Sequence, residues 1–313
     1  MSARKDIDGM AIGIITFVSL IWGVQQVFVK AVATDMSPVL QIALRSGIAA
    51  FLLAMIMLCR KEKLISRSTY KAGLLAGTLF ALEFYFVGEG LRNTSASHMV
   101  IFLYSAPIFV ALCLHFKITS EQLNSIQWLG IITAFLGIAL TFLWRDSQDT
   151  SSAATNMLWG DFLALLAAIS WASTTVLVRS SSLANAPATQ TLFYQLIMCF
   201  ILVLFAAIAM EQTGYTRTTA VLSNLAFQGI VVSFGSLLLW FWLLRQYSAS
   251  QLGVFTFMTP LFGIVFSVWL LDEPLEDSFI VGATMVMMGI VMVNGHSRIK
   301  RGLKLIFQSE VKS

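Results

Sequence analysis

Long apolar runs alternate with short polar connections along almost the whole chain. Ten of these runs reach the length of about 20 residues that a helix needs to cross the hydrocarbon core of a bilayer. They lie near residues 9–33, 38–59, 70–91, 94–115, 125–144, 157–178, 187–210, 220–244, 248–271 and 277–295. The connections are too short to hold a soluble domain. The pattern therefore predicts an all-α integral membrane protein with ten transmembrane helices.

The composition excludes a water-soluble fold. Of the 313 residues, 58% are hydrophobic and 12% are charged, and the mean hydropathy is +0.81. The net charge of +4 does not indicate a nucleic-acid partner, because no basic face with interleaved aromatic residues follows from the sequence. Cys59, Cys113 and Cys199 lie singly in apolar runs without metal-ligand spacing. We therefore expect neither a metal site nor a cofactor.

The first run raises the question of a cleaved signal peptide. Arg4 and Lys5 precede it, and Ala31-Val32-Ala33 near its end resembles a signal-peptidase site. Its apolar stretch is longer than the hydrophobic region of a signal peptide. We therefore expect a retained first helix that follows a cytoplasmic tail of residues 1–8.

Basic residues indicate the side of the membrane that each connection faces. If both termini are cytoplasmic, 15 Lys and Arg residues fall on the inner side. Four fall on the outer side, namely Lys30, Arg92, Arg145 and Arg217. Cytoplasmic connections of membrane proteins carry an excess of positive charge. The asymmetry predicts that both termini lie in the cytoplasm.

The two halves of the chain resemble each other. The matching elements are Trp22 and Trp171, Pro38 and Pro187, the Ser-Ala-Ser motifs at 95–97 and 248–250, Pro107 and Pro260, and Glu121, Gly130 and Gly137 with Glu273, Gly282 and Gly289. Because these matches occur in the same order in both halves, they indicate an internal repeat.

An odd number of predicted spans in each half makes the repeat inverted. We place the first repeat at residues 9–146, the second at 157–295, and a basic amphipathic tail at 296–313. Inverted repeats are typical of secondary transporters, because two similar halves can open one site to alternate sides of the membrane. The pattern therefore predicts alternating access around a central cavity.

The same elements resemble a known family. The chain resembles the EamA family of the drug/metabolite transporter superfamily in several elements and in their matches in the second half. These elements are Trp22-Gly23, the turn at residues 91–97 (Leu-Arg-Asn-Thr-Ser-Ala-Ser) with Pro107, and the segment from Glu121 to Gly130. The resemblance extends over nearly the whole chain. It implies a helical bundle around a central cavity in the bacterial inner membrane, which exports amino acids or other small metabolites. It does not imply a particular solute.

Two charged residues, Arg45 and Glu83, lie well inside the predicted spans. A rise of 1.5 Å per residue puts them at similar depths, about 10 and 12 Å from the outer ends. A charge at such a depth must face a cavity or a partner. Two interpretations remain open. The residues form a structural ion pair, or Arg45 meets a substrate carboxylate while Glu83 meets an amine or carries a coupled proton.

Further polar and aromatic residues are candidates for the same cavity. Gln25 and Gln26 follow Trp22 by one turn, and their amides cannot face lipid at low cost. His98 is either a titratable coupling residue or an interfacial polar residue. Asp161 falls near the predicted start of the sixth span, where helix capping is the preferred interpretation. The remaining candidates, for which packing is the alternative, are Tyr85, Tyr104, Trp22, Trp171 and Phe257.

Prolines and glycines suggest which helices move and which form the scaffold. Pro107 and Pro260 break the helical hydrogen-bond ladder at equivalent points, so each is either a hinge or a static kink. Glycines spaced by seven residues in the fifth and tenth predicted spans permit close contact between helices. We therefore expect these two spans to form scaffold.

The leading functional hypothesis is an inner-membrane secondary transporter that exports a small, amino-acid-like metabolite. Multidrug or cationic-compound efflux is the alternative, and a channel or an intramembrane enzyme belongs to a different class. An enzyme is not expected, because the sequence holds no phosphate-binding loop, His-Glu-x-x-His motif or Gly-x-Ser-x-Gly motif. The expected partners are a small solute and membrane lipids. A monomer is expected, with a dimer as the alternative.

Overall fold

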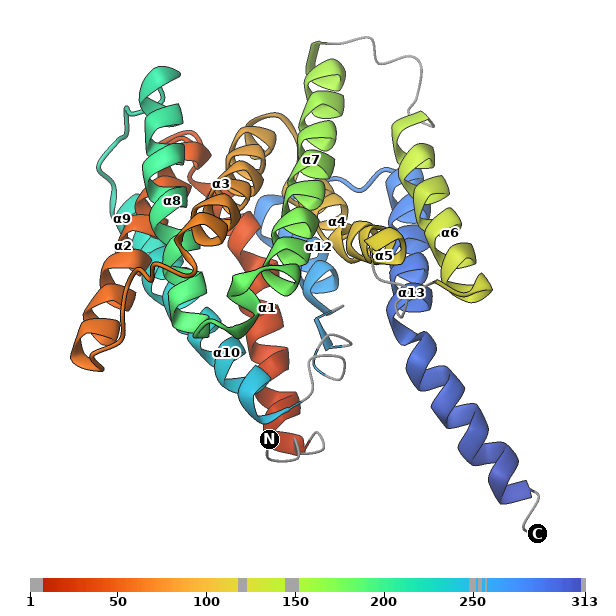
Figure 1. Cartoon of the computed structure of the whole chain (residues 1–313). Coiled ribbons are helices and arrows are strands. Elements are labelled where there is room, and N and C mark those ends of the chain that lie inside the picture. Colours follow the sequence, from red (N-terminus) through yellow and green to blue (C-terminus); the bar gives the residue numbers. More distant parts are fainter. Residues whose placement is uncertain are drawn as a thin grey trace.

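The chain is almost entirely helical in the computed structural model (Figure 1), which describes residues 8–117, 123–143, 152–247, 252, 255, 256 and 258–310. Within these ranges no strand forms, and Met36 and Tyr215 make an isolated antiparallel bridge. The molecule is therefore an all-α bundle, as the hydropathy pattern predicts.

In its described residues, the first half of the chain forms six helices, some of which begin at side-chain caps. They are α1 (Gly9–Ala31), α2 (Pro38–Cys59), α3 (Tyr70–Asn93), α4 (Ala96–Leu103), α5 (Ala106–Lys117) and α6 (Ser125–Leu143). Asp8 Oδ1 accepts a hydrogen bond from Ala11 N–H at 2.8 Å, and Ser37 Oγ accepts one from Leu40 N–H at 3.1 Å. These side chains satisfy backbone donors that lack a partner within the helix.

The helices of the second half include two non-α segments. The elements are α7 (Ser152–Ser180), the 3-10 helix η2 (Ser182–Asn185), α8 (Ala188–Ala209), α9 (Thr219–Ala226), the π-helix η3 (Phe227–Ser236), α10 (Leu237–Gln246), α12 (Met258–Leu271) and α13 (Asp277–Glu310). A π-helix of ten residues is unusual, and π segments are frequent at functional sites.

Two of the predicted spans each consist of more than one helical segment. The span at 94–115 consists of α4 and α5, with a turn at Tyr104 and Ser105 between them. The ring of Pro107 would clash with the carbonyl four residues earlier, which is that of Leu103, the last residue of α4. The span at 220–244 consists of α9, η3 and α10. Each span is nevertheless long and apolar enough to cross a membrane as a whole, over Ala96–Phe116 and Thr219–Trp240.

The outer surface of the bundle is apolar. Seven helical stretches of the described residues are long and apolar enough to cross a membrane, and three shorter apolar helices, Ser125–Thr141, Met258–Leu271 and Asp277–Val293, accompany them. Large side chains such as Phe51, Phe205 and Trp269 are exposed on the outside. Such a surface is typical of helices that face lipid.

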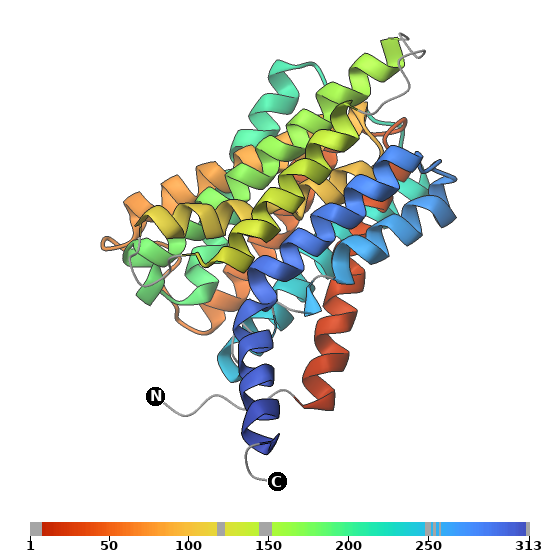
Figure 2. The ribbon, with the colours of Figure 1, turned by 90° about the vertical axis from the view of Figure 1, so that its right-hand side faces the viewer.

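Helices from the two halves pack side by side. α1 lies along α12, α2 along α8, α3 along α7 and α8, and α6 along α13 (Figures 1 and 2). In the α6–α13 pair, a Cβ on Gly130 would come within 2.7 Å of Met292 Cβ, and one on Gly137 within 2.6 Å of the Gly282 carbonyl oxygen. Since only residues without a side chain allow this approach, the predicted close contact at the glycines is confirmed.

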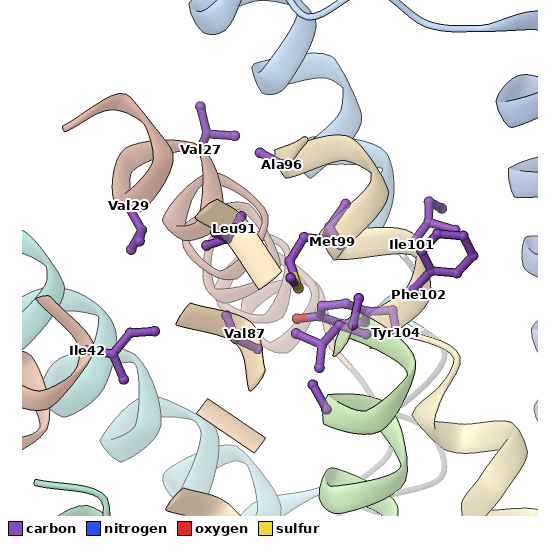
Figure 3. Packing of buried hydrophobic residues seen from close by; sticks show 14 of the residues in the cluster. Val27, Val29, Ile42, Val87, Leu91, Ala96, Met99, Ile101, Phe102 and Tyr104 are labelled. Atoms are coloured by element: carbon purple, nitrogen blue, oxygen red, sulfur yellow. The ribbon is translucent and has the colours of Figure 1, made fainter. Parts of the chain in front are cut away.

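The largest buried cluster extends through both halves of the chain, and one part of it joins α1, α2, α3 and α4. Val27 and Val29 of α1, Ile42 of α2, Leu91 of α3 and Met99 of α4 are fully buried and gather in one region (Figure 3). Figure 3 also places the Tyr104 ring in this cluster, at the turn after α4. The cluster thus fixes the helices that border the cavity described below.

α13 continues beyond the predicted tenth span. The sequence predicts an end near residue 295 and a separate tail, whereas the helix runs without a break from Asp277 to Glu310. Its 34 residues extend over about 50 Å, against about 30 Å for a hydrocarbon core. The last part of the helix leaves the bundle (Figures 1 and 2). The boundary predicted at residue 295 is therefore not a break in the helix.

Candidate functional site

A cavity of about 900 Å³ lies between helices of both halves. Its wall is mainly apolar and carries a small number of polar groups, which is typical of sites for small molecules. The site candidates from the sequence that line it are Trp22, Gln25, Arg45, Glu83, Tyr104 and Trp171. Pro107 and Pro260 also line it. The cavity therefore brings together most of the residues that the sequence singles out.

Arg45 of α2 is held by two glutamines and an aromatic ring. Its Nη1 donates hydrogen bonds to Gln25 Oε1 at 3.2 Å and to Gln228 Oε1 at 2.8 Å. Its Cζ lies 4.7 Å from the centroid of the Phe84 ring, within the range of a cation–π interaction. The residue is only 2% exposed, and its Nε has no hydrogen-bond partner. A buried positive charge with an unused donor therefore borders the cavity.

Glu83 of α3 is buried on the same cavity wall. Its Oε2 has no hydrogen-bond partner. Arg45 and Glu83 both belong to the described residues, and no ion pair within 4.0 Å joins them. Buried polar atoms without partners are costly. The two side chains are therefore suited to a ligand that brings one group for each.

Aromatic rings form two edge-to-face pairs on the cavity wall. The ring centroids of Trp22 and Trp240 are 5.5 Å apart, and those of Tyr104 and Trp171 are 5.3 Å apart. Trp22 Nε1 also donates a hydrogen bond to Ser236 Oγ at 2.8 Å, at the end of η3. The tryptophans matched by the internal repeat thus both supply apolar surface to the cavity.

Three sequence candidates do not line the cavity. Gln26 is buried, and neither its Oε1 nor its Nε2 has a hydrogen-bond partner. Tyr85 donates its hydroxyl to Met210 Sδ at 3.6 Å. His98 pairs with a carboxylate elsewhere in the bundle. A fourth candidate, Phe257, lies outside the described residues.

His98 of α4 forms a buried cluster with Asp161 of α7. Its Nδ1 lies 3.0 and 3.1 Å from the two carboxylate oxygens, and Thr94 Oγ1 donates to Asp161 Oδ1 at 2.5 Å. The imidazole stacks on Phe279 of α13, with ring centroids 4.2 Å apart. Both residues are buried inside the bundle. The capping interpretation of Asp161 is wrong, because α7 begins at Ser152, more than two turns earlier.

Two further charged residues, Lys30 and Glu273, form hydrogen bonds near the His98–Asp161 cluster, where α3 ends and α4 begins. Lys30 Nζ donates hydrogen bonds to the carbonyl oxygens of Leu91 at 2.6 Å and Thr94 at 2.7 Å, at the end of α3. Glu273 accepts hydrogen bonds from the backbone N–H groups of Ala96 at 2.7 Å and Ser97 at 3.1 Å, at the start of α4. A cation at a helix C-terminus and an anion at a helix N-terminus are both favourable.

Gln228, which accepts a hydrogen bond from Arg45, is not among the candidates from the sequence. A signal was present, since Gln228 is a lone amide in the apolar run of residues 225–235 and must find a polar partner there. Sequence alone could not identify that partner, because Arg45 is 183 positions away.

The site offers binding groups for a small solute. Among the described residues, no group of three or more His, Cys, Asp or Glu could hold a metal ion. Arg45 and Glu83 supply opposite charges, and the aromatic pairs supply apolar surface. The arrangement can therefore bind an amphipathic molecule by noncovalent contacts alone.

An all-helical bundle with an apolar outer surface and an internal cavity defines a membrane protein of the transporter class. The model of the EamA-like transporter family matches residues 9–143 and 158–295. The chain belongs to this family.

Curated relatives and a solved structure agree with this assignment. The chain is 25% identical over 283 residues to the uncharacterized transporter YoaV of Bacillus subtilis, covering 90% of this chain and 95% of the relative. It is 25% identical over 287 residues to the "Probable amino-acid metabolite efflux pump" of Escherichia coli, covering 87% of this chain and 91% of the relative. A crystal structure matches with a TM-score of 0.61 at 17% identity, covering 90% of this chain and 95% of that chain. This last likeness shows the fold alone.

Proposed function

We propose that the chain is a secondary transporter that exports a small, amino-acid-like metabolite by alternating access. The observation that carries the proposal is the position of Arg45 and Glu83 on one aromatic-walled cavity, each with a buried atom that lacks a partner. A carboxylate complements the guanidinium and an ammonium group complements the carboxylate. One zwitterionic solute therefore satisfies both residues. Proton exchange through Glu83 or the solute gradient drives its export.

The proposal includes two inverted repeats of five spans each. Two separate matches to the family model, one in each half, support it. α2 and α8 each have 22 residues, and each is followed by a left-handed residue, Lys61 at φ 55° and Glu211 at φ 56°. Pro107 and Pro260 lie on the wall of one cavity. We propose that they act as hinges when the cavity changes the side to which it opens.

We further propose that the protein is a monomer in the bacterial inner membrane with both termini in the cytoplasm. The cavity is lined by helices of one chain, and relatives come from Bacillus subtilis and Escherichia coli. Single cysteines at Ser66 and Ser147 test the orientation in a chain without its three native cysteines. An impermeant thiol reagent should label Ser147→Cys from outside and leave Ser66→Cys unlabelled. The reverse pattern would overturn the orientation.

Counterflow in liposomes tests the transport function. Purified protein is reconstituted into vesicles that are loaded with an unlabelled amino acid, nucleoside or cationic dye. The same compound in radiolabelled form is then added outside, and its uptake is measured. Saturable counterflow of an amino acid is the expected result. Glu83 and the aromatic pairs also suit an organic cation, so saturable exchange of dyes alone would favour cationic-compound efflux. Conductance that does not saturate would favour a channel.

A further inference from the structure

Gln228 connects the cavity arginine to a neighbouring helix. It lies in the first turn of η3 and is fully buried. Its Nε2 donates a hydrogen bond to the Gln25 carbonyl oxygen at 2.8 Å, and its Oε1 accepts one from Arg45 Nη1 at 2.8 Å. A carbonyl oxygen only accepts and a guanidinium only donates, so the orientation of the amide is fixed. Gln228 therefore ties α1, α2 and η3 together at Arg45.

Both glutamine side chains engage the same nitrogen of Arg45. Nη1 carries two protons, and Gln25 and Gln228 accept them. Phe84 covers one face of the guanidinium plane. Among the described residues, Arg45 donates no other hydrogen bond, and its Nε is without a partner. With Nη1 occupied, Nε and Nη2 form the edge of Arg45 that makes no hydrogen bond within the described residues, and Nε itself is buried.

We infer that Gln228 is a positioning residue that presents the Nε and Nη2 edge of Arg45 to a carboxylate of the transported solute. The N–H bonds on this edge are parallel and match the two oxygens of a carboxylate. The inference rests on the proposed function and adds to it the recognised group and a residue that sets selectivity for it.

The neutrality of Gln228 is essential to this role. A neutral amide orients Arg45 and leaves its positive charge for the ligand to compensate. A glutamate at position 228 has nearly the same size, but it would compensate Arg45 permanently. It would also place a carboxylate oxygen against the Gln25 carbonyl oxygen, where Nε2 now donates. Gln228→Glu should therefore remove the preference for an anionic ligand.

Chemical modification of Arg45 tests the inference without knowledge of the natural solute. Phenylglyoxal labels arginines in the purified full-length protein, and peptide mass spectrometry measures the rate at each one. Benzoate and benzamide are matched probes that differ in the carboxylate. Benzoate should slow labelling of Arg45 about tenfold, because it occupies the free edge, and benzamide should not. Arg67, which is exposed and does not line the cavity, is the internal reference.

Two variants test whether the protection of Arg45 by benzoate depends on Gln228. In Gln228→Glu, benzoate should no longer slow the labelling of Arg45. Gln228→Met, which removes both hydrogen bonds without adding a charge, should weaken the protection. The matched control is Gln190→Glu, because Gln190 Oε1 also accepts from a side chain, Thr69, and its Nε2 donates to the Lys63 carbonyl oxygen. Gln190 lies outside the cavity wall, so this control should retain full protection by benzoate.

The outcomes separate this inference from the proposed function. Equal effects of benzoate and benzamide on the wild-type protein would overturn the inference, and so would full benzoate protection in both Gln228 variants. The wild-type comparison decides even if Gln228→Glu fails to fold. Gln228-dependent protection in a protein that shows no counterflow would uphold the carboxylate site and reject export.

Discussion

Glu273 caps the first turn of α4 from the other half of the chain, with its Oε1 2.7 Å from the backbone nitrogen of Ala96. Its Oε2 accepts two further hydrogen bonds, from the backbone N–H and the hydroxyl of Ser97. The segment between α12 and α13 is thereby attached to the start of a helix that borders the cavity. An anionic acceptor at a helix N-terminus satisfies backbone donors and interacts favourably with the helix dipole.

Removing the charge of Glu273 should loosen this end of the bundle. Glu273→Gln should reduce the stability of the folded protein by about 1–2 kcal/mol, because hydrogen bonds to an ionised acceptor are stronger than those to an amide. Thermal unfolding in detergent measures the loss. Asp272→Asn removes the same charge from the neighbouring exposed residue and should have little effect. Equal losses in the two variants would contradict a specific cap.

The buried pair of His98 and Asp161 should be worth more than any surface ion pair. Asp161→Asn should lower stability by about 1–3 kcal/mol, because it replaces the buried carboxylate that contacts Thr94 and His98 with an amide and leaves their hydrogen bonds weakened or unmade. Glu89→Gln breaks the partly exposed Arg92–Glu89 pair and should cost at most about 1 kcal/mol. Chemical unfolding of both variants in detergent measures the difference. Similar small losses would show that the His98–Asp161 contact contributes little.

Arg45 and Glu83 should be needed separately for transport. Arg45→Ala and Glu83→Gln should each abolish counterflow while folded protein remains in the membrane, because each residue lines the cavity and has a buried polar atom without a partner. Since no direct ion pair joins them, the double variant should stay inactive. Restored counterflow in the double variant would support a purely structural pair, and normal kinetics in either single variant would exclude that residue from the site.

The hydropathy pattern predicts most helices well because burial in lipid requires long apolar runs. α2 begins and ends at the predicted residues, 38 and 59, where Ser37, Pro38 and the basic residues after Cys59 mark both ends. Pro107 predicts a break in the helical ladder close to the turn at Tyr104, whereas the π-helix η3 lies in an apolar run without proline and was not predicted. Because the neighbours of Pro107 are apolar on both sides, the sequence does not show whether the helix bends or ends there.

The candidate site was predictable only in part. Arg45 and Glu83 are conspicuous because charges are rare inside apolar spans. Their surroundings depend on contacts between distant segments, such as Gln228 with Arg45 and Asp161 with His98. One sequence gives the polar residues but not their partners. His98 could therefore be identified as noteworthy, but its contact with Asp161 could not be predicted.

The C-terminal part of α13 should bind the inner leaflet of the membrane. The helix continues to Glu310, beyond the length that a bilayer requires. In the sequence, apolar residues at helical spacing share one face, and basic residues surround it: Ile299, Leu303, Ile306 and Phe307, with Arg298, Lys300, Arg301 and Lys304. Such segments bind anionic lipids through apolar burial and charge attraction.

A peptide of residues 296–313 tests this expectation. Its helical circular dichroism should increase with anionic vesicles and decrease at high salt, because salt screens the attraction between basic residues and headgroups. Vesicles of zwitterionic lipid are the control and should produce a smaller increase. Gly302 weakens helix formation in isolation, so any helix must come from binding. An unchanged spectrum with anionic vesicles would leave the segment as a topology signal, and truncation after Arg301 should then preserve counterflow.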